Sequence, residues 1–256
     1  KFVLPGVSAD ASCDFYVVIN RNIADNITTK AKLLEELESD IASYNGTYAN
    51  VTTKAMRSGG FAMTGTVTAK IVSGTTAVTV TVKRVVAKVE IQTSMTDSFR
   101  TKYSNGCVEV KKITLSRGAE KSYLIDQTAS KYATVSSSFT SAQDAYCDKT
   151  GASKTNAYKY NNLFYINEKA AAATGSRIKV VLDAIYDADG NLSTTADQVP
   201  LSYETELTGT TDGKMLRNGS YKLNVNLDGL TGKDMTLSIA IANWEALSTQ
   251  NVNVGK

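Results

Sequence analysis

The sequence predicts a mainly β protein with one short helix, built from one or two β-sandwiches. The 256-residue chain is rich in Thr, Ser, Val and Ala, a composition that suits half-exposed strands. Short apolar segments with period-two alternation recur along it, and Gly, Asn, Asp and Ser separate them. Helical spacing of apolar residues is convincing in a single segment near the N-terminal end.

The longest β-branched run is Ala77–Gln92, which contains neither Gly nor Pro. Its first half alternates with Val78, Val80 and Val82 at even positions. In the second half, the alternating apolar residues have odd numbers: Val85, Ala87, Val89 and Ile91. A shift by one residue sends every following side chain to the opposite face. The run therefore contains either a bulge near residues 83–84 or a strand that passes from one core to another.

The helix is expected to begin at Thr28 or Thr29, either of which can cap it, and to end at Asn45–Gly46. Leucines and Ile41 recur on one face of this segment. The other strands expected from alternation or apolar runs are Cys13–Asn20, Phe61–Val72, Val108–Ser116, Tyr123–Ile125, Leu163–Ile166, Arg177–Tyr186, Ser220–Leu227 and Met235–Asn243.

Two polar stretches suggest how the chain is divided. Ser94–Gly106 follows the long run directly, and we interpret it as a seam between an N-terminal domain, residues 1–95, and a C-terminal domain, residues 96–256. Ala129–Asn156 shows little periodicity and is interpreted as a long decorated loop.

The composition argues against an enzyme. The chain has no histidine, the residue that most often serves as a general base and as a transition-metal ligand. Its three cysteines, Cys13, Cys107 and Cys147, are too scattered for a metal site, and whether Cys107 and Cys147 pair stays open. The net charge is +3, and basic and acidic residues are interspersed along the chain, which does not favour nucleic-acid binding. We therefore expect no catalytic site, no cofactor and no metal.

The segment Asp187–Gly190 has the acidic and glycine residues of a calcium loop. An EF-hand loop starting at Asp187 would need Gly at its sixth position and Glu at its twelfth. Those positions hold Leu192 and Gln198. We interpret the segment as a hairpin turn.

The C-terminal tail is too apolar for a solvated linker. Its apolar positions are Trp244, Ala246, Leu247, Val252 and Val254, and no complementary apolar run follows them. One interpretation is an ordinary last strand that pairs within its own subunit. The other is a strand donated to a neighbouring molecule, which would satisfy an open sheet edge there.

Six short motifs follow one another along the chain, and in this order they resemble the fimbrillins, the pilin subunits of type V pili in Bacteroidales. They are Phe15–Asn20 (aromatic-V-V-x-N), Phe61–Gly65 (M-[ST]-G), Arg84–Val89 (R-x-x-A-K-[VI]), Phe164–Glu168 (F-Y-x-x-E-N, with Lys169 where Asn is usual), Leu216–Tyr221 (R-N-x-x-Y) and Trp244. The resemblance assigns structural roles to the motif residues Arg84, Ala87, Lys88, Arg217, Asn218 and Tyr221. It also implies that the two domains are transthyretin-like sandwiches.

The resemblance further implies a function. Fimbrillins are exported as lipoprotein precursors to the outer membrane, and a protease removes an N-terminal strand. The C-terminal strand of a neighbouring subunit then fills the groove, so identical subunits form a head-to-tail filament at the cell surface, with anchor and tip pilins as further partners. Family members generally carry two more strands before Phe15–Asn20, so we expect the N-terminal domain of this chain to lack its first strands.

An alternative is a pilus-tip or surface adhesin that binds a glycan or a host protein. Tyr158 and Tyr160 could stack on sugars, because aromatic faces present flat apolar area. The same residues are also compatible with strand packing. The apolar tail favours a polymerising subunit over this alternative.

Overall fold

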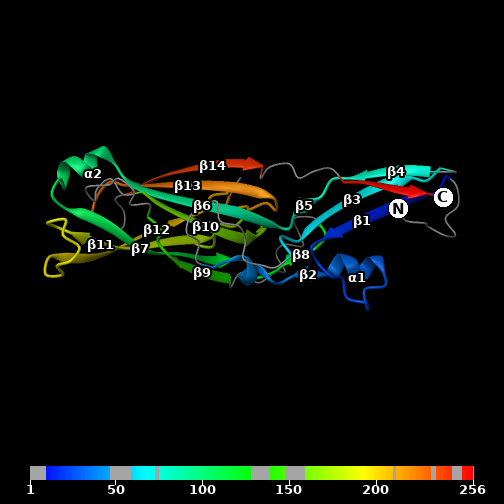
Figure 1. The fold of residues 1–256 in the computed structure, drawn as a ribbon, viewed down its shortest axis with the longest axis horizontal. Coiled ribbons are helices and arrows are strands. Elements are labelled where there is room, and N and C mark those ends of the chain that lie inside the picture. Colours follow the sequence, from blue (N-terminus) through cyan, green and yellow to red (C-terminus); the bar gives the residue numbers. More distant parts are fainter. Residues whose placement is uncertain are drawn as a thin grey trace.

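The computed structural model describes residues 10–46, 59–72, 75–127, 139–147, 159–209, 212–231, 235–243 and 250–255, the last two ranges as backbone only. The molecule is elongated, with a large β-sandwich at one end and a smaller β region at the other (Figure 1). The prediction of a mainly β sandwich protein is confirmed.

The large sandwich consists of two four-stranded sheets. The first has the order β10 (Tyr160–Asn167), β6 (Val86–Met95), β13 (Gly219–Leu227) and β14 (Met235–Asn243). The second has the order β12 (Gln198–Glu206), β11 (Lys179–Asp187), β7 (Cys107–Gly118) and β9 (Phe139–Asp144). Strands β6 and β13 run parallel, and the other pairs in these sheets are antiparallel.

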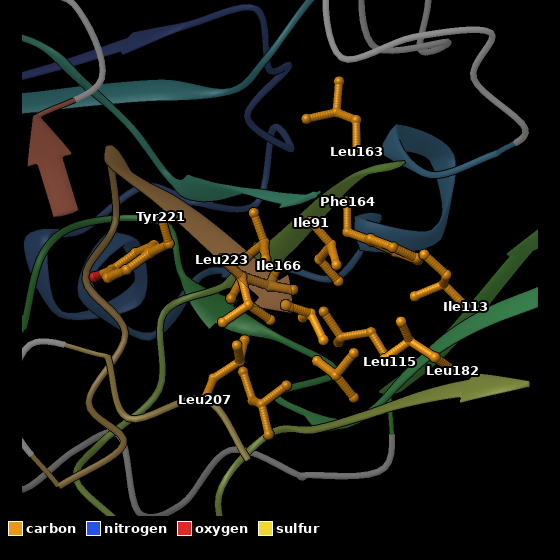
Figure 2. Close-up of a cluster of buried hydrophobic side chains, with 14 of the residues drawn as sticks. Ile91, Ile113, Leu115, Leu163, Phe164, Ile166, Leu182, Leu207, Tyr221 and Leu223 are labelled. Carbon is orange, nitrogen blue, oxygen red and sulfur yellow. The ribbon is translucent and has the colours of Figure 1, made fainter. Parts of the chain in front are cut away.

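Both sheets contribute apolar side chains to one core (Figure 2). The alternation predicted for β13 is confirmed, because Tyr221, Leu223, Val225 and Leu227 are all buried. They meet Ile113, Leu115 and Leu182 of the facing sheet in one hydrophobic cluster. The outer side of β10 is covered as well, since Tyr165 packs on Phe61, which stacks on Tyr44.

The smaller region contains short sheets. β1 (Ser12–Ile19), β3 (Met63–Lys70) and β5 (Lys83–Arg84) form one of them, and β4 (Thr75–Val80) pairs with β15 (Gln250–Gly255) in another. β2 (Leu37–Glu38) pairs with β8 (Ser122–Tyr123) between this region and the large sandwich (Figure 1).

The change of phase in Ala77–Gln92 marks the passage from one core to another. Val78 and Val80 belong to a small cluster in the smaller region, whereas Val86 and the apolar residues after it belong to the core of the large sandwich. Val85 lies between them, in a third cluster with Ala62 and Leu124. Strand β6 thus pairs with strands of the large sandwich, although the expected boundary after residue 95 groups it with the N-terminal domain. The division into residues 1–95 and 96–256 stays a prediction.

The predicted helix begins where expected and ends early. α1 spans Lys30–Glu35, and the Thr29 hydroxyl accepts a hydrogen bond from the Lys32 N–H. The backbone becomes extended at Glu36, with ψ of 135°, and the chain continues through β2 into a 3₁₀ turn, η1 (Ile41–Tyr44). The helical spacing of Ile41 therefore reflects a separate turn whose buried side chains pack on the large core.

Besides β2 and η1, three more elements were not predicted. α2 (Asp97–Lys102) lies in the expected polar seam, where Thr96 caps it and Phe99 is its buried residue. β9 lies in the expected loop Ala129–Asn156, of which residues 129–138 and 148–156 lie outside the described ranges. β12 is an edge strand with Pro200 and many exposed positions, so its alternation is weak. None of the described helices is long and apolar enough to cross a membrane.

Candidate functional site

The C-terminal strand β15 lies far from the sheet that precedes it in sequence. β14 belongs to the large sandwich, whereas β15 pairs antiparallel with β4 at the opposite end of the molecule (Figure 1). Val252 stands opposite Val78 in this register, and Val254 stands opposite Thr76. The other predicted donor residues, Trp244, Ala246 and Leu247, lie outside the described residues. The described part of the tail is thus paired within its own chain.

Among the described side chains, the region that receives β15 has a thin core. Of these side chains, only Val78 and Val80 are buried in its cluster, and those packed against them are all half-buried: Phe15, Val17, Val67 and Ala69. Within the described residues, β15 is the one strand that shares a sheet with β4. The backbone groups on this side of β4 therefore depend on β15 for their hydrogen bonds.

Three of the motif residues, Arg84, Arg217 and Asn218, lie where the two regions meet, and Arg84 and Asn218 contact each other. Asn218 has a positive φ of 56°, in the turn just before β13. Its side-chain oxygen accepts hydrogen bonds from the Arg84 N–H at 3.3 Å and from Arg84 Nη1 at 3.4 Å, and its own N–H donates to the Val86 carbonyl at 2.9 Å. Asn218 thus fixes the point where β5 passes into β6.

Arg217 is the centre of a buried polar network. Its Nε donates to Glu168 Oε2 at 2.8 Å, and Nη2 contacts Oε1 of the same carboxylate. Nη1 and Nη2 also donate to the carbonyls of Leu124, at 3.0 Å, and Tyr123, at 2.6 Å. The Ser122 hydroxyl donates to Glu168 at 2.9 Å. A single guanidinium therefore joins the turn before β13, the end of β10 and the segment around β8.

The remaining motif residues lie on strands β6 and β13 of the large sandwich. Ala87 is fully buried in the large core, and Lys88 is a half-buried residue of β6. The Tyr221 hydroxyl accepts a hydrogen bond from the Leu216 N–H at 2.7 Å, and burial raises the pKa of this phenol. These three positions are assigned by the sequence motifs, and their contacts fit packing roles.

Lys169 stands where the fimbrillin motif usually has Asn. Its Nζ donates to the Arg117 carbonyl at 2.5 Å, and its backbone pairs with Met215. Burial, together with the positive charge of Arg117, lowers the pKa of Lys169. The Lys169 side chain therefore connects the end of β10 to β7.

The structure also describes one of the two tyrosines considered for sugar stacking and all three cysteines. Tyr160 is buried, and its hydroxyl donates to the Val108 carbonyl at 3.4 Å, so its ring does not offer a face for stacking on a sugar. Tyr158 lies outside the described residues. Cys13, Cys107 and Cys147 are all described, and none of them is disulfide-bonded.

The fold is shared with solved fimbrial and adhesion proteins of Bacteroidales. A candidate cell adhesion protein from Bacteroides eggerthii superposes with a TM-score of 0.55 at 13% identity, over 90% of this chain and 77% of its own. The tip fimbrial protein Mfa3 from Porphyromonas gingivalis gives 0.52 at 15% identity, over 90% and 80%. The fimbrilin FimA from the same species gives 0.51 at 15% identity, over 92% and 81%.

No protein-family model and no curated protein matches the sequence. The structural similarity therefore identifies the fold, and the fold is that of the fimbrillins, as the six motifs imply. Both a tip fimbrial protein and a fimbrilin are among these neighbours, so the fold is common to these two kinds of fimbrial protein.

Proposed function

We propose that this protein is a structural subunit of a cell-surface fimbria that polymerises by donor-strand exchange. In this proposal the C-terminal strand of one subunit pairs with β4 of the next one, after removal of an N-terminal strand. Identical subunits are the main partners, and anchor and tip pilins complete the fimbria. The precursor is exported as a lipoprotein to the outer membrane.

The observation that carries the proposal is the pairing of β15 with β4. β15 is separated from β14 by residues 244–249 and pairs with a strand at the far end of the molecule. Its backbone hydrogen bonds are thus made outside the sheet that contains β14. Such a strand can be replaced by the same strand of a neighbouring subunit, with the same register. Such an exchange is heterologous, so it continues into a filament instead of closing into a dimer.

The thin core around β4 supports the same proposal. Phe15, Val17 and Val67 are half-buried although they face a cluster of buried valines. A strand that brings apolar residues to this cluster gains about 1.5–3 kcal/mol for each side chain that it buries fully. Val252 and Val254 alternate with Asn251 and Asn253, the pattern of a strand with one apolar face.

Cysteine cross-linking distinguishes exchange from intramolecular pairing. Thr79 and Asn251 are directly opposite in the ladder, so cysteines at both positions are within disulfide reach. In purified fimbriae, T79C/N251C should give a ladder of covalent oligomers that collapses on reduction, and neither single variant should do so. A cross-link confined to monomers would contradict the proposal.

Deletion of residues 244–256 tests the donor role separately. The truncated protein should keep the folded large sandwich, since its core lies elsewhere, and should fail to polymerise. Val252→Asp combined with Val254→Asp should have the same effect, whereas Asn251→Asp combined with Asn253→Asp, the matched control on the polar face, should assemble. Normal filaments from the truncated protein would refute the donor-strand proposal.

The adhesin alternative makes a different prediction. A tip or surface adhesin that does not donate a strand would bind its glycan or host protein without residues 244–256, and it would not form filaments with this tail. The burial of Tyr160 removes one of the residues on which the alternative rests.

A further inference from the structure

The loop between β11 and β12 brings three carboxylates together. One oxygen from each of Asp187, Asp189 and Asp197 lies within 4.8 Å of the others. Residues 187–198 contain no Lys or Arg, and none of these three carboxylates forms an ion pair with a Lys or Arg of the described ranges. Three like charges at this separation repel one another unless a cation lies between them.

Asp187 gives a second, independent indication. It is 0% exposed. Its Oδ2 accepts a hydrogen bond from Gln198 Nε2 at 3.1 Å, whereas its Oδ1 is buried without any hydrogen-bond partner. A buried carboxylate oxygen without a partner is costly, because water no longer solvates it and nothing replaces the water. The unsatisfied oxygen therefore points to a positively charged partner at this position.

The loop also holds the other two carboxylates in place. The Asp189 N–H donates to Asp197 Oδ2 at 3.0 Å, and the Asn191 N–H donates to Asp189 Oδ1 at 2.7 Å. Gln198 Nε2 donates to the Thr194 carbonyl at 2.8 Å and to the Leu192 carbonyl at 3.4 Å. Since these bonds fix the loop backbone, the carboxylates are positioned before any ion binds.

We propose that this loop binds a calcium ion through Asp187, Asp189 and Asp197. The donors are oxygens alone, without the thiolate or imidazole ligands that zinc sites usually contain, and this set suits a hard cation. Calcium accepts six to eight oxygens in flexible geometry, so loop carbonyls and water can complete its coordination, whereas magnesium requires a near-ideal octahedron. The site differs from an EF-hand, because Leu192 and Gln198 occupy the positions where an EF-hand has Gly and Glu.

The position of the loop makes this site independent of the proposed assembly strand. The β11–β12 hairpin lies at the end of the large sandwich, and β4 and β15 lie at the opposite end of the molecule (Figure 1). Bound calcium would neutralise the three carboxylates and hold the ends of β11 and β12 together. Its effect is therefore expected on the stability of the large sandwich and not on strand exchange.

Calorimetric titration of the chelator-treated full chain with calcium chloride, and separately with magnesium chloride, tests the proposal. One calcium ion should bind per chain, magnesium should bind more weakly, and calcium should raise the melting temperature. Asp189→Asn and Asp197→Asn should each weaken calcium binding about tenfold or more. Asp183→Asn, the control on β11, replaces a carboxylate that accepts a hydrogen bond from Ser202, and it should bind calcium as the wild type does.

Two results would overturn the proposal. One is the absence of both calcium heat and a melting shift in the wild-type chain. The other is calcium binding that Asp189→Asn and Asp197→Asn leave unchanged, which would place the ion elsewhere. Circular dichroism of each variant without calcium shows that the fold is kept, and Asp189 is suited to this purpose because it is exposed in the loop.

Discussion

Arg217 and Glu168 form an ion pair whose side chains are 5% and 2% exposed, in the turn before β13 and just after β10. Two charges this far from water are stable only where hydrogen bonds satisfy their remaining groups. Arg217 meets this condition through the carbonyls of Tyr123 and Leu124, and Glu168 through the Ser122 hydroxyl. The pair thereby ties the large sandwich to β8 and to Leu124, the residue that follows it.

We predict that Arg217→Met lowers the free energy of unfolding by about 3–5 kcal/mol, because it leaves the Glu168 carboxylate buried without its partner. Denaturant titration measures the change. The control is Glu204→Gln, which removes an exposed partner of Lys179 and should cost about 0–1 kcal/mol. In a double-mutant cycle, Arg217→Met with Glu168→Leu should cost less than the sum of the single changes. Additive losses would contradict a coupled pair.

Asn218 combines a left-handed backbone with a side-chain role, so its substitutions should fall into a definite order. Asn218→Gly keeps the positive φ but loses the hydrogen bonds to Arg84. Asn218→Ala loses the same bonds and also carries a left-handed strain of about 1–2 kcal/mol. Chemical denaturation should therefore rank stability as wild type, then Asn218→Gly, then Asn218→Ala. Equal stability of the Gly and Ala variants would contradict the backbone argument.

The elements that the sequence predicts correctly are those whose pattern depends on local spacing. The alternation of β13 predicts its buried face. The phase change after Val82 predicts either a bulge or a passage between two cores, and the structure places its two halves in different clusters. The spacing of Ile41 fits one long helix as well as it fits the observed helix and separate 3₁₀ turn. Local spacing therefore does not predict that the chain becomes extended at Glu36, where packing on the large core decides. β12 has no such pattern, because an edge strand leaves many of its side chains in solvent.

Local spacing does not predict which residues the motif residues contact. The motifs single out Arg217, Asn218 and Arg84, but nothing in their spacing indicates that Arg84 and Asn218 touch across 134 residues. Glu168 belongs to another motif, 49 residues before Arg217. A buried salt bridge has no periodicity, since its position depends on the turns that bring its two residues together. The tail likewise predicts a strand but not the partner β4.

Tyr160 should make stability depend on pH in the alkaline range. Burial, together with the nearby Cys147, raises the pKa of its phenol well above the ordinary value of 10.0. The folded state therefore favours the neutral phenol, and this contribution is fully present below the unfolded pKa and is lost as the pH rises above it. Tyr160→Phe should make the fall in unfolding free energy above about pH 10 shallower. An unchanged slope in denaturant titrations across that range would contradict the prediction.

Gly65, the third residue of the Met63–Gly65 motif, has no room for a side chain. A Cβ at this position would lie 2.2 Å from the Thr81 carbonyl oxygen and 3.0 Å from Val80 Cγ1, because the backbone that leaves β4 passes directly over β3. Gly65→Ala must therefore push this backbone away, at a cost of about 1–3 kcal/mol.

The displaced residue, Thr81, directly follows β4, the strand that pairs with β15. Gly65→Ala should therefore lower the stability of the smaller region and weaken the pairing of β15 with β4. Thermal unfolding and the yield of the T79C/N251C cross-link measure the two effects. Thr66→Ala, at an exposed position on the same strand, is the matched control and should change the melting temperature little. If Gly65→Ala melts and cross-links as the control does, the close approach of Thr81 to β3 does not constrain this residue.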